Sequence, residues 1–135
     1  MSHVVVIGAG QAGSSLVAKL RNSGFKGDVT LIGEETAPPY QRPPLSKAYL
    51  LGDMALERLF LRPESFYADQ KINLHMGAAV TAIDGAKRQI HLGDDVISYD
   101  QLALTTGSAA RVLPAAIGGA LEGVHTVRTL ADVDA

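Results

Sequence analysis

The sequence has 135 residues, the length of one ordinary domain, and 47% of them are apolar, which is enough for a packed core. The formal net charge of −2 gives no electrostatic reason to expect binding to nucleic acid or to an anionic membrane. The absence of cysteine excludes a disulfide, a thiolate zinc site, an iron–sulfur cluster held by this chain and a redox-active dithiol. No apolar stretch approaches the roughly 18 residues that span a bilayer, and no leader precedes Val4, so we expect a soluble, cytoplasmic protein.

The first elements predict a strand–helix–strand unit. Val4–Ile7 is a run of β-branched residues that ends in glycines, which is typical of a strand buried on both faces. Gln11–Ser23 has apolar residues at helical spacing, and Gly24 is a natural residue to end that helix. Val29–Ile32 is a second buried strand. Because such crossovers are right-handed, we expect the two strands to be parallel neighbours.

The middle of the chain is predicted to be irregular. The segment from Ala37 to Pro44 contains four prolines, which remove backbone donors and fix φ, so it is neither a helix nor a central strand. Pro44 suits the first position of a short helix that runs through Leu51 and ends at Gly52. A further helix is predicted from Pro63 to Lys71.

From Ile72 onward the apolar residues recur with a period of two. Asp84-Gly85 and Gly93-Asp94-Asp95 supply turns, so the last three of four short strands are predicted to form an antiparallel meander. These four strands are Ile72–His75, Ala78–Ile83, Gln89–Leu92 and Val96–Ser98. Leu102–Leu104 is predicted as another buried strand, and the pattern weakens after Gly107. The predicted fold class is therefore α/β, with a parallel sheet, helices and a small antiparallel meander.

The chemistry-bearing motif is GxGxxG, formed by Gly8-Ala9-Gly10-Gln11-Ala12-Gly13. The pattern alone is weak, but here it follows a strand and opens a helix, the context in which it binds a dinucleotide. The predicted α/β fold is therefore a Rossmann-like FAD/NAD(P)-binding domain. Gly8 permits the tight turn, Gly10 lets a pyrophosphate approach the backbone, and Gly13 lets helix and strand pack closely. The helix N-terminus then offers free N–H groups and partial positive charge to the phosphates.

Glu34 lies 21 residues beyond Gly13, at the end of the second strand. A carboxylate there can accept hydrogen bonds from both ribose hydroxyls, and it would repel a 2′-phosphate, so an NADP site is disfavoured. FAD and NAD share the same ADP half, so these features do not separate the two.

A proline-rich segment favours FAD. Residues 39–47, which end in Arg42-Pro43-Pro44-Leu45-Ser46-Lys47, closely resemble a segment of the oxygenase-coupled ferredoxin reductases, the putidaredoxin and rubredoxin reductase family. The resemblance continues through Lys47-Ala48-Tyr49-Leu50, Leu104-Thr105-Thr106-Gly107 and Arg128-Thr129-Leu130. The ordered series of motifs, not any single one, is what is specific.

The resemblance implies roles for individual residues. The glycines and Ala12 would face the pyrophosphate, Glu34 the adenosine ribose, and Val80 the adenine through its backbone. Arg42 and Lys47 would hold the flavin side, with Lys47 near the reactive edge of the isoalloxazine as the catalytic candidate. The implied cofactor-binding set is Gly8, Gly10, Gln11, Ala12, Gly13, Glu34, Arg42, Pro43, Lys47, Val80, Thr106, Gly107 and Arg128.

Lys47 and Arg128 also have ordinary interpretations. Lys47 falls in the first turn of the predicted helix, where a cation gains nothing from the helix dipole, so a ligand would explain its position; an exposed helix lysine remains the alternative. Arg128 lies in a segment that looks like a connector. The four histidines have no ligand spacing, so no metal site is predicted.

The family continues beyond this length with a second GxGxxG unit for NADH, a later strand with a Gly-Asp pair at the flavin, and an interface domain. We therefore expect an N-terminal fragment, with residues 1–108 as part of the FAD-binding domain and residues 109–135 as a connector toward the NADH domain. Alone, it should lack NADH-dependent electron transfer, bind FAD weakly or not at all, and self-associate through an exposed sheet edge or apolar patch. A small departure is Thr105, where the family usually has alanine.

The resemblance implies that the full-length protein is an enzyme that passes electrons from NADH through FAD to a ferredoxin or rubredoxin. The missing cysteine pair, which related disulfide reductases carry, fits direct electron transfer from flavin to a metalloprotein. Two alternatives remain open: an NAD-binding domain of a dehydrogenase, and a nucleotide-binding module without turnover.

Overall fold

The computed structural model describes all 135 residues. The chain forms two units, which we call the sheet unit (Met1–Tyr40 and Phe60–Gly107) and the loop unit (Gln41–Leu59 and Ser108–Ala135). The strands are β1 (His3–Ile7), β2 (Asp28–Gly33), β3 (Ile72–Met76), β4 (Ala82–Asp84), β5 (Gln89–Leu92), β6 (Asp95–Ser98) and β7 (Gln101–Leu104). The α-helices are α1 (Gln11–Asn22), α2 (Glu64–Asp69) and α3 (Leu130–Asp134), and the 3₁₀ helices are η1 (Pro43–Ser46), η2 (Leu56–Arg58) and η3 (Ala115–Ile117). None of the helices has both the length and the apolar character needed to cross a membrane.

The sheet unit is built on four parallel strands in the order β3-β2-β1-β7. Helix α1 connects β1 to β2, which confirms the predicted strand–helix–strand unit. Strand β2, the next in sequence, pairs with one edge of β1, and β7 pairs with the other edge. The strand order therefore reverses beside β1, and ligands of open α/β sheets bind at the carboxyl ends of the strands at such a point.

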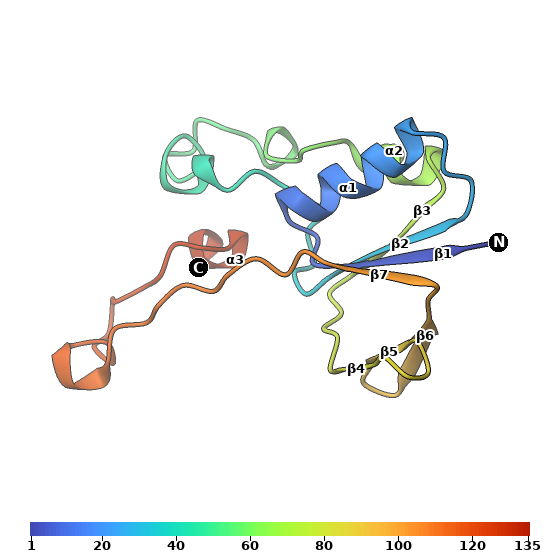
Figure 1. Cartoon of the computed structure of the whole chain (residues 1–135). Helices are drawn as coiled ribbons and strands as arrows, with labels where there is room; N and C mark the ends of the chain where they lie inside the picture. Colours follow the sequence, from blue (N-terminus) through green and yellow to red (C-terminus); the bar gives the residue numbers. More distant parts are fainter. The chain divides into compact units, whose positions relative to one another are not determined.

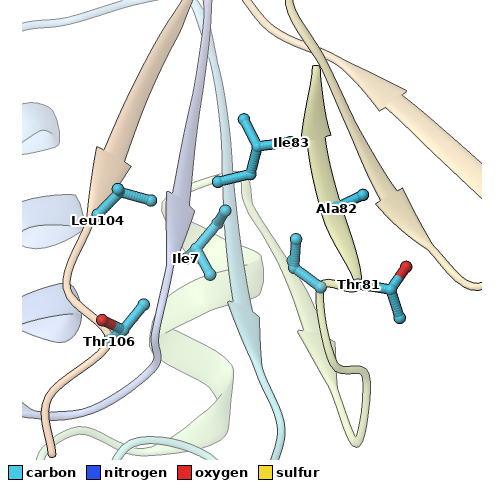
Figure 2. A pocket seen from close by; sticks show the side chains of 7 residues that line it. Ile7, Thr81, Ala82, Ile83, Leu104 and Thr106 are labelled. Atoms are coloured by element: carbon cyan, nitrogen blue, oxygen red, sulfur yellow. The ribbon is translucent and has the colours of Figure 1, made fainter. Parts of the chain in front are cut away.

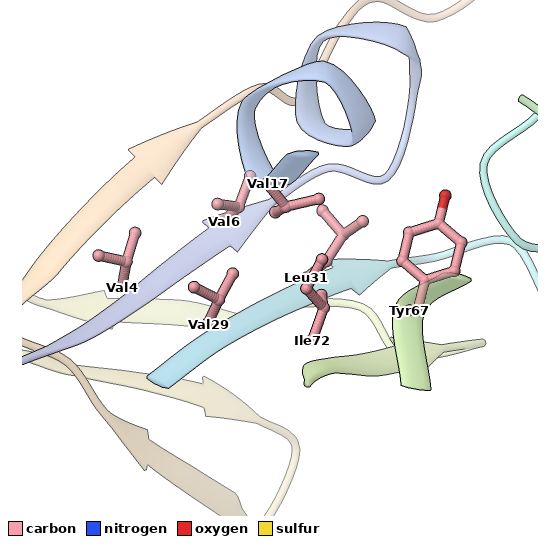
Figure 3. Close-up of a cluster of buried hydrophobic side chains, with 7 residues drawn as sticks. All are labelled: Val4, Val6, Val17, Val29, Leu31, Tyr67 and Ile72. Atoms are coloured by element: carbon pink, nitrogen blue, oxygen red, sulfur yellow. The ribbon is translucent and has the colours of Figure 1, made fainter. Parts of the chain in front are cut away.

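Both faces of β1 are buried, as the run of β-branched residues predicts. Val4 and Val6 pack against Val17 of α1 and Tyr67 of α2 in one core cluster, to which strands β2 and β3 contribute Val29, Leu31 and Ile72 (Figure 3). Val5 and Ile7 belong to a second core cluster with Ile32 of β2 and Ile90 of β5. Strands β4–β6 lie on the side of the parallel sheet away from α1 (Figure 1). Each fully buried aliphatic side chain of this kind contributes about 1.5–3 kcal/mol relative to an exposed one.

Strands β4, β5 and β6 form the predicted antiparallel meander. Its first strand is shorter than predicted, because Ala78 to Thr81 do not belong to it. The N–H groups of Gly77 and Ala78 donate to the carbonyls of Glu35 and Gly33, so this stretch is still tied to the loop after β2.

Three sequence predictions are wrong in detail. No helix runs from Pro44 to Leu51: η1 ends at Ser46 and turns follow, because Lys47 has φ −135° and ψ −117°, which no helix accommodates. The helix predicted from Pro63 to Lys71 is the shorter α2. β7 is an edge strand paired only with β1, so Leu104 is 61% exposed instead of buried.

Candidate functional site

The turn between β1 and α1 is so tightly packed that two of its glycines have no room for a side chain. Gly8 has φ +107°, and a Cβ there would lie 2.1 Å from the carbonyl oxygen of Thr105. A Cβ on Gly13 would lie 2.0 Å from the carbonyl oxygen of Gly8 and 3.1 Å from Leu31 of β2. Gly8 thus makes the turn and Gly13 brings α1 against the sheet, as the motif predicts.

The middle glycine is different, because a Cβ on Gly10 would meet nothing within 4 Å. Gly10 precedes α1 in an extended conformation, with no side-chain cap and no acidic residue in the first turn. The first N–H group of the helix with a backbone partner is that of Ser14, so the N–H groups of Gln11 and Ala12, both exposed residues, remain available. Open space in front of free N–H groups at the positive end of a helix fits a pyrophosphate.

Two adjacent glutamates follow β2, and only one of them is available to a ligand. The buried Tyr40 donates a short hydrogen bond to the carboxylate of Glu35. Glu34, directly after Gly33, is exposed and makes no hydrogen bond or ion pair within the chain. Its carboxylate is therefore the one that can accept ribose hydroxyls, in agreement with its position in the motif.

Val80 and Thr106 line one open hollow of about 390 Å³ in the sheet unit. Figure 2 shows Ile7 and Leu104, which end neighbouring parallel strands, facing Ile83 of β4. The complete lining is Ile7, Val80, Thr81, Ala82, Ile83, Leu104 and Thr106. The hollow lies beside the carboxyl ends of β1 and β7, where the strand order reverses. Gly107 follows with φ +67°, a conformation that favours glycine.

Arg42 and Arg128, which are 86 residues apart in sequence, meet within the loop unit. Nη1 of Arg42 donates to the carbonyl oxygen of Arg128 at 2.6 Å. The N–H groups of Arg128 and Thr129 in turn donate to Asp132 at 2.8 and 2.9 Å, and Thr129 caps α3 in a reciprocal capping box. The bonds from Thr129 and Arg128 hold the pKa of Asp132 below its ordinary value. Arg128 therefore belongs to an ordered helix start, for which Thr129 and Asp132, three residues apart, are a local sequence signal that the sequence analysis missed.

Lys47 lies at the end of η1 and not in the first turn of a helix, so the dipole argument made from the sequence is wrong. The residue is exposed and follows the last residue of η1, where helix carbonyls favour a cation. Its Nζ is 3.4 Å from the carbonyl oxygen of Pro43, the first residue of η1. This position suits a solvated lysine and also suits a cation that binds a cofactor from a proline-containing turn.

Two polar groups beside the glycine loop are not apparent from the sequence. Thr105 Oγ1 donates to the carbonyl oxygen of Gly8 at 2.8 Å, and Ser14 of α1 is completely buried and accepts a hydrogen bond from Arg62 at 2.8 Å. Burial raises the pKa of the neighbouring Tyr67, while its hydrogen bond with Ser14 and the charge of Arg62 oppose that rise. The partners lie 48 to 97 residues apart along the chain, so no local pattern reveals them.

The glycine turn, the free helix N-terminus and the exposed carboxylate after β2 define a dinucleotide-binding protein of the Rossmann type. Residues 2–135 match the family Pyridine nucleotide-disulphide oxidoreductase, and the chain belongs to this family.

Individual relatives are ferredoxin-type reductases. The chain is 46% identical over 132 residues to the rhodocoxin reductase of Rhodococcus erythropolis, covering 97% of this chain and 31% of that protein. The reductase in a covalent putidaredoxin reductase–putidaredoxin complex is 42% identical with a TM-score of 0.91, over 98% of this chain and 33% of that one. A ferredoxin reductase from Rhodopseudomonas palustris is 38% identical with a TM-score of 0.89, over 99% and 33% of the two chains. The chain thus spans about a third of the length of these relatives.

Because Gly10 and Gly13 have different surroundings, substitution by alanine should change the free energy of unfolding by very different amounts at the two positions. Gly13→Ala should lower the free energy of unfolding by several kcal/mol, because its methyl group would overlap a backbone carbonyl. Gly10→Ala should change stability by less than about 0.5 kcal/mol, since its methyl group enters open space in an extended backbone. Urea unfolding of both variants without nucleotide measures this difference. Equal stability of the two variants would contradict the packing described here.

Proposed function

We propose that this chain is the FAD-binding part of an NADH-dependent ferredoxin or rubredoxin reductase. The observation that carries the proposal is the open space at Gly10 in front of the free N–H groups of α1, with Glu34 available at the end of the neighbouring strand. The ferredoxin reductases to which the chain is 38–46% identical support the same assignment. NADH is an intracellular electron donor, so the proposal includes a cytoplasmic location.

Each candidate residue takes a defined part in this proposal. The N–H groups of Gln11 and Ala12 bind the pyrophosphate, with Gly10 leaving it room and Gly8 and Gly13 shaping the turn. Glu34 accepts the adenosine ribose hydroxyls. The backbone of Val80 contacts the adenine, and Thr106 and Gly107 lie beside the phosphates.

The loop unit supplies the flavin side in the same proposal. Arg42 and Pro43 hold the cofactor there, together with Arg128, whose carbonyl oxygen accepts from Arg42. Bound FAD supplies the redox chemistry: it accepts a hydride from NADH and releases single electrons to an iron–sulfur or rubredoxin partner. The chain orients the cofactor, and Lys47 places a positive charge beside it. We propose residues 1–108 as part of the FAD-binding domain and residues 109–135 as the connector to an NADH-binding domain.

The ribose assignment predicts different effects for Glu34 and Glu35. Glu34→Gln should weaken ADP binding to the chain by about 1–3 kcal/mol, because two hydroxyls lose a charged acceptor. Glu35→Gln is the matched control: it weakens the bond from Tyr40 and should lower the melting temperature while leaving ADP affinity within about twofold. Calorimetric titrations and thermal melts separate the two effects. Unchanged ADP affinity in Glu34→Gln would remove the ribose role.

The flavin-side assignment is tested with Lys47 in the complete flavoenzyme. Lys47→Ala should make the FAD midpoint potential more negative and slow reduction by NADH with little loss of FAD binding, because a cation stabilises the negative charge that develops on reduction. Lys47→Arg keeps the charge and should retain most of the wild-type potential. The measurement is a spectroelectrochemical titration of the three proteins. A potential in Lys47→Ala equal to that of the wild type would show that Lys47 is a solvated residue.

A further inference from the structure

The hydroxyl of Thr105 is the only hydrogen-bond donor within the chain for the carbonyl oxygen of Gly8. Thr105 directly follows β7, and its backbone N–H donates to the carbonyl of Ile7 at 2.8 Å, continuing the ladder between β1 and β7. Its Oγ1 then reaches the carbonyl oxygen of Gly8 at 2.8 Å, with the carbonyl of Ile7 farther away at 3.2 Å. A hydroxyl has one proton, so the shorter contact to Gly8 is the dominant bond.

The carbonyl of Gly8 lies where rotation of its peptide would disturb the packing of α1. It is the atom that a Cβ on Gly13 would meet at 2.0 Å, so it lies directly against the first turn of the helix. On the other side, the methyl group of Ala9 would lie 2.7 Å from a Cβ on Gly33, the last residue of β2. The Gly8–Ala9 peptide is therefore confined between the ends of β7 and β2.

We propose that Thr105 is a positioning residue of the dinucleotide loop. Its hydroxyl fixes the Gly8 carbonyl toward β7, and since a trans peptide is planar, the N–H of Ala9 then points the opposite way. This fixed peptide sets where Gly10 and the start of α1 stand relative to Gly33 and Glu34. The inference rests on the proposed function, because the ligand whose affinity it affects is the ADP half of a dinucleotide.

The test compares variants of Thr105 by calorimetric titration with ADP and by melting temperature without ADP. Thr105→Val keeps the shape and removes the hydroxyl, and Thr105→Ala does so with a smaller residue; each should raise the Kd for ADP about tenfold, equivalent to about 1.4 kcal/mol. Thr105→Ser keeps the hydroxyl and should restore the Kd to within about threefold of the wild type. The matched control is Thr30→Val at the middle of β2, which removes a second threonine hydroxyl with a 2.8 Å hydrogen-bond contact, in this case to His3. Thr30 is buried, whereas Thr105 is partly buried. It should lower the melting temperature without changing the Kd.

The outcomes distinguish this inference from the proposed function. A wild-type chain that does not bind ADP contradicts the proposed function itself, and the positioning role with it. If the wild type binds and Thr105→Val or Thr105→Ala binds equally well, the positioning role is wrong while the proposed function stands. Failure of Thr105→Ser to restore affinity would also overturn the inference, because the hydroxyl would not be the group responsible. Should Thr105→Val not fold, Thr105→Ala and Thr105→Ser decide the question.

Discussion

The contact between the carbonyl of Gly8 and the first turn of α1 is the constraint on which the site depends. A Cβ on Gly13 would come within 2.0 Å of that oxygen, so the helix can start here only if position 13 carries no side chain. This contact aims the N-terminus of α1 past the carboxyl end of β1, beside the place where the strand order reverses. With no cap and no acidic residue in the first turn, the free N–H groups have no partner in the chain and suit an anion.

The same packing connects the start of α1, the proposed pyrophosphate site, to the carboxylate of Glu34, the proposed ribose ligand. Ala9 of the turn lies over Gly33, which immediately precedes Glu34, so the positions of the turn and of the carboxylate depend on each other. Tyr40 engages the adjacent Glu35 and leaves Glu34 exposed. In the proposed function, specificity for an ADP group comes from the ends of two parallel strands that this close contact holds together.

The sequence predicts the parts of this protein that depend on local pattern. The β-branched runs at Val4–Ile7 and Val29–Ile32 are confirmed as central strands, and the three glycine roles agree with the space around each residue. The errors concern features that depend on residues distant in sequence. Leu104 is predicted to be buried, but it lies on an edge strand and is exposed. The hydroxyl of Thr105 donates to a carbonyl 97 residues away, and Arg42 donates to the carbonyl of Arg128, 86 residues away, so neither hydrogen bond is visible in a local window.

The most direct test of the central claim is to map the binding of ADP to the wild-type chain by amide chemical shifts in NMR spectra. The account predicts saturable shifts that are largest at Gln11 and Ala12 and at the Gly33–Glu34 pair. The amides of the turn between β5 and β6, around Asp94, should not move. Absence of saturable shifts at the start of α1, or shifts concentrated elsewhere in the chain, would contradict the claim that this helix N-terminus binds the dinucleotide.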